Sequence, residues 1–255
     1  MEGTDMFDLH GRTALVTGSN RGIGRSILLA FAEYGADVIL HCRKPNDRAD
    51  QVIKEAKTYG VHCDAVYSDL SEPDGPQKLY DGVKALGLNV DILVLGASVE
   101  IRNGWTEITD EEFDLQVNTN LRAPMKLMQK FIPEMQARHW GRVITMGSVQ
   151  QIKPIPPLLV YSAMKAAQYN MVLSLAPQIA PDGVTINNLA PGAIRTDRNA
   201  EALSDPAYEA HVQSLIPVRY IGQPDDIAAI AVYLASEESK YMTGENIIIA
   251  GGKDL

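Results

Sequence analysis

Short apolar runs rich in β-branched residues alternate along the chain with longer amphipathic stretches. Seven runs predict strands, at Thr13–Thr17, Val38–Cys42, His62–Tyr67, Ile92–Leu95, Arg142–Met146, Thr185–Leu189 and Asn246–Ala250. Six stretches predict helices, at Ile23–Tyr34, Arg48–Tyr59, Pro76–Leu86, Asp110–Gln136, Leu158–Gln178 and Asp225–Ala235. Strands that alternate with helices are typical of βαβ units. We therefore expect an α/β fold in one domain over residues 1–255: a doubly wound parallel sheet of about seven strands with helices on both faces.

Two segments interrupt this alternation. Pro154-Ile155-Pro156-Pro157 precedes a predicted helix, and the polar stretch 195–217 follows the sixth predicted strand. Both follow carboxyl ends of strands, where open α/β sheets bind ligands, so we expect residues 195–217 to form a substrate loop or lid. Pro177 lies late in the predicted helix Leu158–Gln178 and lacks an N–H group, which predicts a kink or an early end near Ala176.

A glycine-rich loop, Thr17-Gly18-Ser19-Asn20-Arg21-Gly22-Ile23-Gly24, follows the first predicted strand and opens a helix. Glycines at such a turn let the backbone approach a pyrophosphate, which the helix N-terminus then stabilises. A plain strand-to-helix turn is the alternative for an isolated loop of this kind. The T-G-x-x-x-G-x-G spacing resembles that of the short-chain dehydrogenase/reductase family.

Further motifs of that family follow in order between Leu9 and Gly252. They are Asp69, Asn120-Leu121, Ser148, Tyr161-Ser162-Ala163-Met164-Lys165, Asn187 with Pro191-Gly192, and Thr243-Gly244-Glu245 with Gly251-Gly252. On these motifs the chain is identified as a member of the family. The resemblance implies a Rossmann-type NAD(P)-binding domain and an oxidoreductase that transfers hydride between a CH–OH group and a nicotinamide cofactor.

The resemblance also assigns residues to the cofactor. They are Gly18, Asn20, Arg21, Gly22, Ile23, Gly24, Arg43, Asp69, Leu70, Gly96, Ala97, Ser98, Asn120, Tyr161, Lys165, Pro191, Gly192, Ile194 and Thr196. An acid at the end of the second strand would repel a 2′-phosphate, whereas this chain has Cys42 followed by Arg43, with Arg21 nearby. The sequence therefore favours NADP(H) over NAD(H). A solvated turn at Arg43 and a helix cap at Asp69 remain alternatives.

Tyr161 and Lys165 are four residues apart, so they share one face of a helix. An ammonium beside a phenol favours the phenolate and lowers its pKa, which would let Tyr161 act as a general acid and base. By resemblance, Ser148 hydrogen-bonds the substrate oxygen, and Asn120 holds a water that connects Lys165 to solvent. The prediction is a catalytic set of Ser148, Tyr161, Lys165 and Asn120.

The chain departs from the family pattern after the fourth strand, where Leu95-Gly96-Ala97-Ser98 stands in place of Asn-Asn-Ala-Gly. Small residues there still let the backbone approach a cofactor, but the asparagine contacts are lost. Near the C-terminus, Ala250 stands where the family has Asp. Neither change touches Ser148, Tyr161 or Lys165, so we expect the reaction class to be retained.

Substrate choice depends on the loops. The residues expected to line the substrate site are Arg102, Gln150, Gln151, Lys153 and Arg198, together with Glu100, Arg195 and Asn199. This polar set predicts a small hydroxylated or anionic substrate, such as a sugar acid or polyol, as in gluconate 5-dehydrogenases. Two alternatives remain: a 3-oxoacyl-carrier-protein reductase and a non-catalytic NADPH sensor.

Charge and cysteine content narrow the other possibilities. The chain has 23 Lys and Arg against 32 Asp and Glu, a formal net charge of −9, which argues against nucleic-acid or anionic-membrane partners. Two cysteines fit a reducing compartment, and the acidic start Met1–Met6 resembles no signal peptide, so a cytoplasmic location is expected. Scattered His and Cys residues predict no metal site. By resemblance, helices around Asp110–Gln136 and Leu158–Gln178 form a homodimer or homotetramer.

Overall fold

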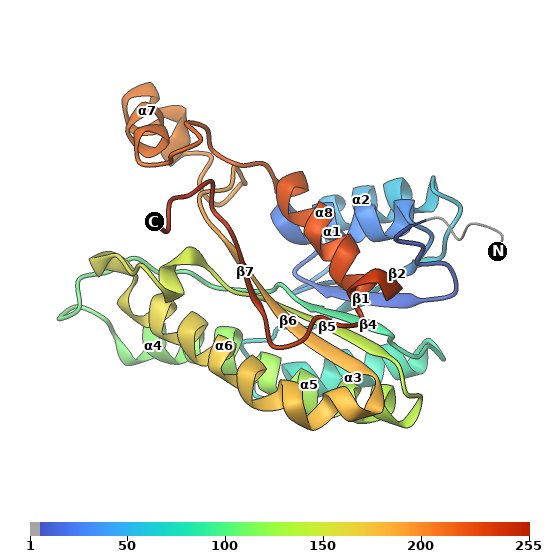
Figure 1. The fold of residues 1–255 in the computed structure, drawn as a ribbon. Coiled ribbons are helices and arrows are strands. Elements are labelled where there is room, and N and C mark those ends of the chain that lie inside the picture. Colours follow the sequence, from blue (N-terminus) through green and yellow to red (C-terminus); the bar gives the residue numbers. More distant parts are fainter. Residues whose placement is uncertain (1–5) are drawn as a thin grey trace.

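Seven parallel strands form one twisted sheet in the computed structural model, which describes residues 6–255 (Figure 1). Met1–Asp5, in the acidic start considered above, lie outside the described residues. The order across the sheet is β3-β2-β1-β4-β5-β6-β7, with every pairing parallel. The strands are β1 Thr13–Thr17, β2 Asp37–Cys42, β3 Cys63–Tyr67, β4 Ile92–Leu95, β5 Gly141–Met146, β6 Val184–Pro191 and β7 Asn246–Ile249. The prediction of a doubly wound parallel sheet is confirmed.

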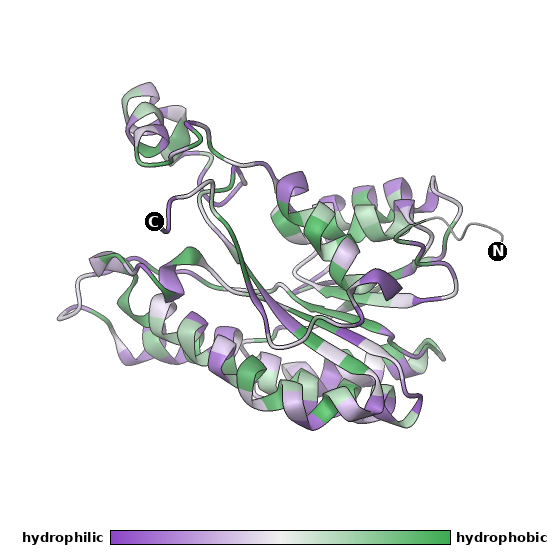
Figure 2. Ribbon diagram, viewed as in Figure 1, coloured by the Kyte–Doolittle hydropathy of each residue, from purple (hydrophilic) through white to green (hydrophobic). Residues whose placement is uncertain are grey.

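Helices cover both faces of the sheet (Figure 1). One layer consists of α1 Gly22–Glu33, α2 Asp47–Lys57 and α8 Pro224–Ala235. The opposite layer consists of α3 Gly75–Ala85, α4 Asp110–Val117, α5 Ala123–Ala137 and α6 Leu159–Ile179. The apolar strands lie between these layers, and polar residues gather on the outward helix faces (Figure 2). No helix within residues 6–255 has the length and apolarity needed to cross a bilayer.

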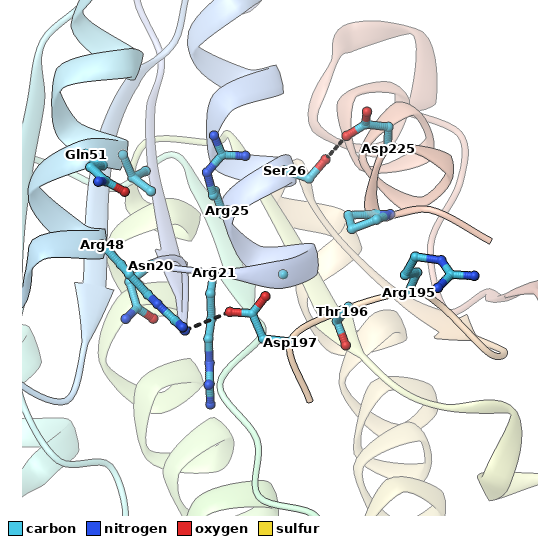
Figure 3. Close-up of a pocket in the computed structure, with 13 residues that line it drawn as sticks. Asn20, Arg21, Arg25, Ser26, Arg48, Gln51, Arg195, Thr196, Asp197 and Asp225 are labelled. Carbon is cyan, nitrogen blue, oxygen red and sulfur yellow. Dashed lines mark hydrogen bonds and ion pairs between the residues drawn. The ribbon is translucent and has the colours of Figure 1, made fainter. Parts of the chain in front are cut away.

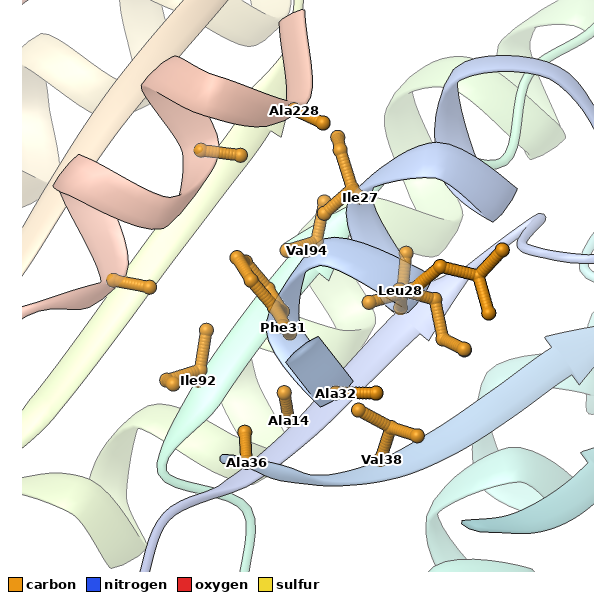
Figure 4. Packing of buried hydrophobic residues seen from close by; sticks show 14 of the residues in the cluster. Ala14, Ile27, Leu28, Phe31, Ala32, Ala36, Val38, Ile92, Val94 and Ala228 are labelled. Atoms are coloured by element: carbon orange, nitrogen blue, oxygen red, sulfur yellow. The ribbon is translucent and has the colours of Figure 1, made fainter. Parts of the chain in front are cut away.

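Alternate residues of each strand enter different cores, because successive side chains point to opposite faces of a sheet. Ala14 and Val16 join the cluster under α1 and α8, whereas Leu15 joins the cluster under α5 and α6. Phe31 of α1 is fully buried in the first cluster, among side chains of β1 and β4 (Figure 4). Burial on both faces explains why these strands are continuous apolar runs in the sequence.

The helix predicted over Asp110–Gln136 is not continuous. Between α4 and α5 the chain forms a π-helical segment, Asn118–Arg122, in which the N–H of Ala123 bonds to Asn118 O. Asn120, at the centre of this segment, bonds through its side chain to the main chain of Val99. The prediction of one uninterrupted helix is wrong, because this tertiary contact widens the turn.

The structure also shows how the chain runs at Pro177 and over residues 195–217, whose role as a substrate loop or lid stays a prediction. α6 continues through Pro177 to Ile179, so the predicted end near Ala176 is wrong. The proline removes one main-chain donor close to the helix end, and Ala180 N–H still bonds to Ala176 O. The segment 195–217 is partly helical, with α7 at Pro206–Ser214 projecting beyond the carboxyl edge of the sheet (Figure 1).

Candidate active site

The glycine-rich loop packs tightly against the loop that follows β4. Gly18 has φ of +72°, and a Cβ there would lie 2.9 Å from the Cα of Ala97. A Cβ on Gly24 would lie 2.5 Å from the main-chain oxygen of Gly18. Only glycine fits these two positions, so the turn from β1 into α1 requires both glycines for its own packing. The first main-chain N–H groups of α1 have no partner within the helix.

Thr17, which the sequence did not single out as a site residue, joins these two loops. Its hydroxyl donates to Val94 O at 3.2 Å and accepts from the N–H groups of Gly96 (2.9 Å) and Ala97 (3.1 Å). The backbone after β4 is therefore held without the family's asparagine side chains. The sequence feature that could have identified this residue is its position as the threonine that opens the glycine motif.

His41, at the end of β2, is a second residue that the sequence analysis missed. Its Nδ1 accepts from Gly18 N–H at 3.3 Å, and its Nε2 lies 3.1 Å from Ser68 O. Nδ1 must therefore be the unprotonated nitrogen, and Nε2–H donates to Ser68 O. Burial lowers the pKa of His41 to about 4. A neutral imidazole thus connects the glycine loop to the end of β3.

We expect His41→Gln to make the protein's stability less sensitive to acid. An unfolded histidine takes a proton near pH 6.5, whereas folded His41 does so only near pH 4. His41 therefore contributes stability that is present above pH 6.5 and is lost as pH falls to about 4, by about 3 kcal/mol in all. Urea unfolding across this pH range measures the change. The exposed His62→Gln is the control, and an unchanged slope in His41→Gln would contradict the assignment.

The predicted cations near the nucleotide phosphates lie at the surface. Arg21 occupies the N-cap position of α1 without a side-chain capping bond and is exposed. Arg43 is also exposed, with Nε 3.8 Å from Oδ2 of Asp69. Asp69 accepts from the N–H and hydroxyl of Ser71 at 3.0 and 2.6 Å. Asp69 does not cap α3, whose N-cap residue is Asp74, so the helix-cap alternative is wrong.

A cavity of about 340 Å³ opens between α1, α2 and the segment after β6 (Figure 3). Arg48 donates to Asp197 at 2.7 Å on one side of it, and Arg21 extends beside this ion pair. Of the predicted cofactor residues, the lining includes Asn20, Arg21, Gly22 and Thr196. It also includes three arginines that were not assigned to the cofactor, Arg25, Arg48 and Arg195. Each of these three is paired with a carboxylate, so Arg21 is the candidate among the lining arginines for a phosphate.

Other predicted cofactor residues lie in or near the protein core. Leu70 and Ile194 are buried in the hydrophobic clusters, so they could contact a nucleotide only through the main chain. Pro191 ends β6, and a Cβ on Gly192 would lie 2.7 Å from the Cα of Ala250. Ile23 is partly buried against the first cluster. These residues shape the carboxyl edge of the sheet.

Ser148, Tyr161 and Lys165 are brought together by β5 and α6. Ser148 follows β5 and caps a 3-10 turn, with its hydroxyl accepting from Gln150 N–H at 3.2 Å. Lys165 is fully buried, and its Nζ donates to Met146 O at 2.6 Å and to Gln168 Oε1 at 3.3 Å. Burial lowers the pKa of Lys165 to about 7, so its ammonium can lose a proton near neutral pH.

The pKa of Tyr161 is raised in the structure, whereas the sequence predicted that it would be lowered. Burial raises the pKa of Tyr161, and Lys165 Nζ, which donates to Met146 O, lies 5.6 Å from the centroid of the Tyr161 ring. The opposing influences are the positive charge of Arg198 and polar contacts with Ser148 and Arg198, while Glu100 adds to the rise. The net direction of the Tyr161 pKa is therefore opposite to the predicted lowering, and the contribution of Lys165 stays a prediction.

Asn120 lies close to this group but its side chain is occupied. Nδ2 donates to Val99 O at 2.7 Å, and Oδ1 accepts from Val99 N–H at 3.1 Å. Asn120 is also fully buried. Its amide therefore holds the loop after β4 against the π-helical segment, and the water-holding role remains a prediction.

Three predicted substrate-lining residues point elsewhere. Gln150 Oε1 accepts from Ile155 N–H at 3.0 Å, within its own loop. Lys153 Nζ donates to the main-chain oxygen of Leu255 at 2.8 Å, which ties this loop to the chain end. Gln151 Oε1 accepts from Ser148 N–H at 3.2 Å. The polar side-chain atoms of these three residues are bonded to nearby main-chain groups, which the sequence alone does not reveal.

Gln151 belongs to an amide network behind Ser148. Its Oε1 accepts from Asn188 Nδ2 (3.3 Å), and its Nε2 donates to Asn246 Oδ1 (3.0 Å). Asn188 Nδ2 also donates to Asn246 Oδ1 at 2.7 Å. A Cβ on Gly147 would lie 2.4 Å from both Asn188 Nδ2 and Gln151 Oε1, so the network fills the space beside the candidate catalytic serine.

Gln151→Ala is expected to reduce stability by about 1–3 kcal/mol and to lower turnover. The change leaves the Ser148 N–H without its acceptor and removes one of the two acceptors of Asn188 Nδ2, which should loosen the serine. Nucleotide affinity should change little, because the glycine loop is untouched. Gln150→Ala is the matched control, since that amide accepts only a loop N–H. Equal effects of the two substitutions would contradict the positioning role.

Charged side chains surround the outer side of Tyr161. Arg198 Nη2 donates to Ser98 O (3.0 Å) and to Ser98 Oγ (2.9 Å). Glu100 lies between Arg198 and Arg102, with an oxygen 3.1 Å from Arg102 Nε. Arg198 and Glu100 thus lie near Tyr161, and Arg102 is joined to them through Glu100.

Two other residues of the expected lining are bound within the segment after β6. Arg195 pairs with Glu209 of α7. Asn199 Nδ2 donates to Ile194 O at 2.8 Å, and its Oδ1 accepts from Thr196 N–H at 2.9 Å. These bonds shape the segment and occupy the polar ends of both side chains.

Comparison with known proteins gives consistent matches over nearly the whole chain. A family profile described as enoyl-(acyl carrier protein) reductase matches residues 18–254. The 3beta-hydroxysteroid dehydrogenase 1 of Eggerthella lenta is 32% identical over 249 residues, covering 97% of this chain and 95% of that protein.

Two solved structures are close in fold. A 3-oxoacyl (acyl-carrier-protein) reductase from Agrobacterium tumefaciens C58 with NADP bound has a TM-score of 0.93 at 39% identity, covering 97% of this chain and 96% of that one. A putative NAD(P)-dependent gluconate 5-dehydrogenase from Beutenbergia cavernae with bound NADP has a TM-score of 0.91 at 32% identity, covering 97% and 98%. With the ordered motifs and the sheet topology, these matches confirm that the chain belongs to the short-chain dehydrogenase/reductase family of oxidoreductases.

Proposed function

We propose that this protein is an NADP(H)-dependent oxidoreductase that interconverts a secondary alcohol and a ketone, with Tyr161 as general acid and base. The observation that carries the proposal is the convergence of Ser148, Tyr161 and Lys165 beside the glycine loop. In ketone reduction, the Tyr161 hydroxyl gives its proton to the carbonyl oxygen, and in alcohol oxidation the phenolate takes it back. Ser148 orients that oxygen and stabilises the charge that develops on it.

The residues present fit a dinucleotide. The tight turn at Gly18 and Gly24 leads directly into the N-terminus of α1, whose first N–H groups have no partner within the helix, and Arg21 lines the adjacent cavity. When bound, NADPH supplies the hydride. Arg21 and Arg43 are the groups proposed to bind a 2′-phosphate, and both similar structures named above contain NADP. We propose that Lys165 binds the nicotinamide ribose and serves the Tyr161 proton transfer.

The proposed substrate is a small polar carbonyl compound or alcohol, a sugar acid or polyol. Arg198 near Tyr161 suits a carboxylate or several hydroxyl groups, and Arg102 lies beyond it, paired with Glu100. The gluconate 5-dehydrogenase from Beutenbergia cavernae is a similar protein with such a substrate in its name.

A second candidate is a ketoreductase that acts on an acyl thioester. The segment after Ser148 carries two exposed apolar residues, Ile152 and Ile155, which would suit an acyl chain better than a sugar. The similar reductase from Agrobacterium tumefaciens is named for such a substrate. Against this candidate, the net charge of −9 is unfavourable for an acidic carrier protein.

We also propose a cytoplasmic homo-oligomer. Both cysteines, Cys42 and Cys63, are free and buried. On α5, one of the helices expected at an interface, Leu127, Met128 and Phe131 lie in the core, whereas Met125 is 37% exposed. Other exposed apolar side chains on α4 and α6 are Phe113, Leu159 and Leu173. A dimer formed through these helices would cover them.

The proposal is tested by titrating the purified protein with NADPH and NADH and then measuring rates on a panel of sugar acids, polyols, diketones and acetoacetyl thioesters. We expect tighter NADPH binding and turnover of a sugar acid or polyol. Thioester turnover alone would select the second candidate. Tight NADPH binding without turnover of any compound would contradict the enzymatic proposal and favour a nucleotide sensor.

A further inference from the structure

The ion pair between Arg48 and Asp197 joins two elements that lie on opposite sides of the glycine loop. Arg48 lies in the first turn of α2, and Asp197 lies in the segment after β6. In the sheet, β2 lies on one side of β1, and β6 lies on the other side. Because the carboxyl ends of parallel strands meet at one edge of the sheet, the ion pair crosses that edge beside the turn from β1 into α1 (Figure 3).

The contact is direct, and it lies where the cavity beside α1 meets solvent. Arg48 Nη1 donates to Asp197 Oδ2 at 2.7 Å, and both residues line the cavity. About half of each side chain is exposed, 55% for Arg48 and 49% for Asp197. An ion pair exposed to this extent contributes little to stability, so it can open and close without unfolding its surroundings.

The glycine loop is contacted from both sides by the elements that this ion pair joins. On the side of β6, Thr196 Cγ2 lies 3.5 Å from the position of a Cβ on Gly22. On the side of α2, Asn20 Nδ2 donates to Oδ1 of Asn46, the N-cap residue of α2, at 3.4 Å. Asn20, Gly22 and Thr196 are predicted cofactor residues, so the ion pair closes the part of the cavity where a nucleotide is expected.

Neighbouring side chains attach the segment after β6 to two other elements. Arg195 pairs with Glu209 of α7, and Arg198 Nη2 donates to Ser98 O at 3.0 Å in the loop after β4. Loss of the Asp197 contact would leave both of these attachments in place. Opening of the ion pair would therefore release only the α2 side of the segment, and the rest of the segment would keep its position.

We propose that Arg48 and Asp197 form a clasp that closes the nucleotide site and slows the exchange of NADP(H). The inference rests on the cofactor site of the proposed function and is independent of the proton transfer by Tyr161. Neither Arg48 nor Asp197 is assigned to the reacting atoms, so both are positioning residues. Their joint effect is on the rates at which the nucleotide enters and leaves the site.

The test is the rate of NADPH dissociation, measured by stopped-flow displacement of the bound nucleotide without any substrate. Arg48→Met and Asp197→Ala should each accelerate dissociation by about twofold to fivefold, the range expected for a half-exposed ion pair. The double variant should be no faster than either single variant, because each substitution already removes the whole pair.

Glu55→Ala is the matched control. It removes a carboxylate from the ion pair with Arg25, which lines the same cavity but joins α1 to α2 without the segment after β6. The change in charge equals that of Asp197→Ala, and the clasp is untouched, so the dissociation rate should stay nearly constant. Equal acceleration by Glu55→Ala and Asp197→Ala would assign the effect to charge and would overturn the proposal.

Opposite effects of the two clasp substitutions would also overturn the proposal. If Arg48 were itself a phosphate ligand restrained by Asp197, Arg48→Met would accelerate release and Asp197→Ala would slow it. Unchanged rates, or additive effects in the double variant, would likewise reject a clasp. Faster NADPH release in both variants, with no turnover of the substrate panel by the unmodified protein, would reject the proposed reaction alone.

A second readout needs no nucleotide. Hydrogen–deuterium exchange of the main-chain N–H groups over residues 195–199 should be faster in Arg48→Met and in Asp197→Ala, and to the same extent. Glu55→Ala should leave this exchange unchanged. Exchange as slow as in the unmodified protein would show that the ion pair does not hold the segment, and it would overturn the proposal.

Discussion

Tyr161→Phe is expected to reduce turnover about 10²–10⁴-fold while the fold and NADPH binding remain intact. The phenol is the only group placed to exchange a proton with the substrate oxygen in the proposed mechanism, and general acid–base catalysis typically contributes a factor of this size. Phenylalanine fills the same space in α6, so packing is conserved. Steady-state rates with the best substrate of the panel, together with NADPH titration, measure both quantities.

The matched control for this substitution is Tyr169→Phe, on the same helix but away from Ser148. Tyr169 packs against the core under α5 and α6, and its change should leave turnover within about twofold. Turnover by Tyr161→Phe close to that of the unmodified protein would show that another group handles the proton. Loss of NADPH binding in Tyr161→Phe would instead show that the hydroxyl serves the cofactor.

Arg43→Asp combined with Arg21→Ser is expected to change cofactor preference by about 100-fold or more. Each arginine could make a charge-assisted bond to the 2′-phosphate, worth about 1.5–3 kcal/mol, and the new carboxylate would repel the phosphate while accepting a ribose hydroxyl. NADPH affinity should fall steeply, and NADH affinity should fall little or rise. Binding titrations with both nucleotides measure the ratio.

Lys54→Asp combined with Lys57→Ser makes the same change in net charge at the far end of α2. This control should leave the NADPH to NADH ratio nearly unchanged, because both lysines are exposed and lie in the last turn of the helix. Equal losses of NADPH and NADH binding in the Arg43 and Arg21 variant would contradict the assignment of the 2′-phosphate to these arginines.

The sheet could be predicted from the sequence because its strands are buried on both faces. Residues such as Leu15 and Val16 enter opposite cores, so the whole run is apolar and its ends are marked by glycine and polar residues. The π-helical segment could not be predicted in this way. It depends on the bond between Asn120 and Val99, which are far apart in sequence and meet only in the folded chain.

For the candidate site, too, the sequence predicted local spacing but not the contacts between segments that are distant in the chain. The spacing of Tyr161 and Lys165 places them on one helix face, but it does not say that Met146 O, at the end of β5, takes the ammonium. Likewise, the sequence shows His41 only as an isolated histidine and does not indicate its role. Its role depends on the order of β1, β2 and β3 in the sheet, which brings Gly18 and Ser68 to its two ring nitrogens.

The proposed reaction is hydride transfer from NADPH to a carbonyl carbon, with the proton supplied by Tyr161. The most direct test incubates the protein with a ketone from the panel and NADPH deuterated at the transferring position of the nicotinamide, and then locates deuterium in the product by mass spectrometry and NMR. We predict deuterium on the carbinol carbon with the unmodified protein and a 10²–10⁴-fold slower transfer with Tyr161→Phe. Bound NADPH with no deuterium on any product carbon would contradict the account.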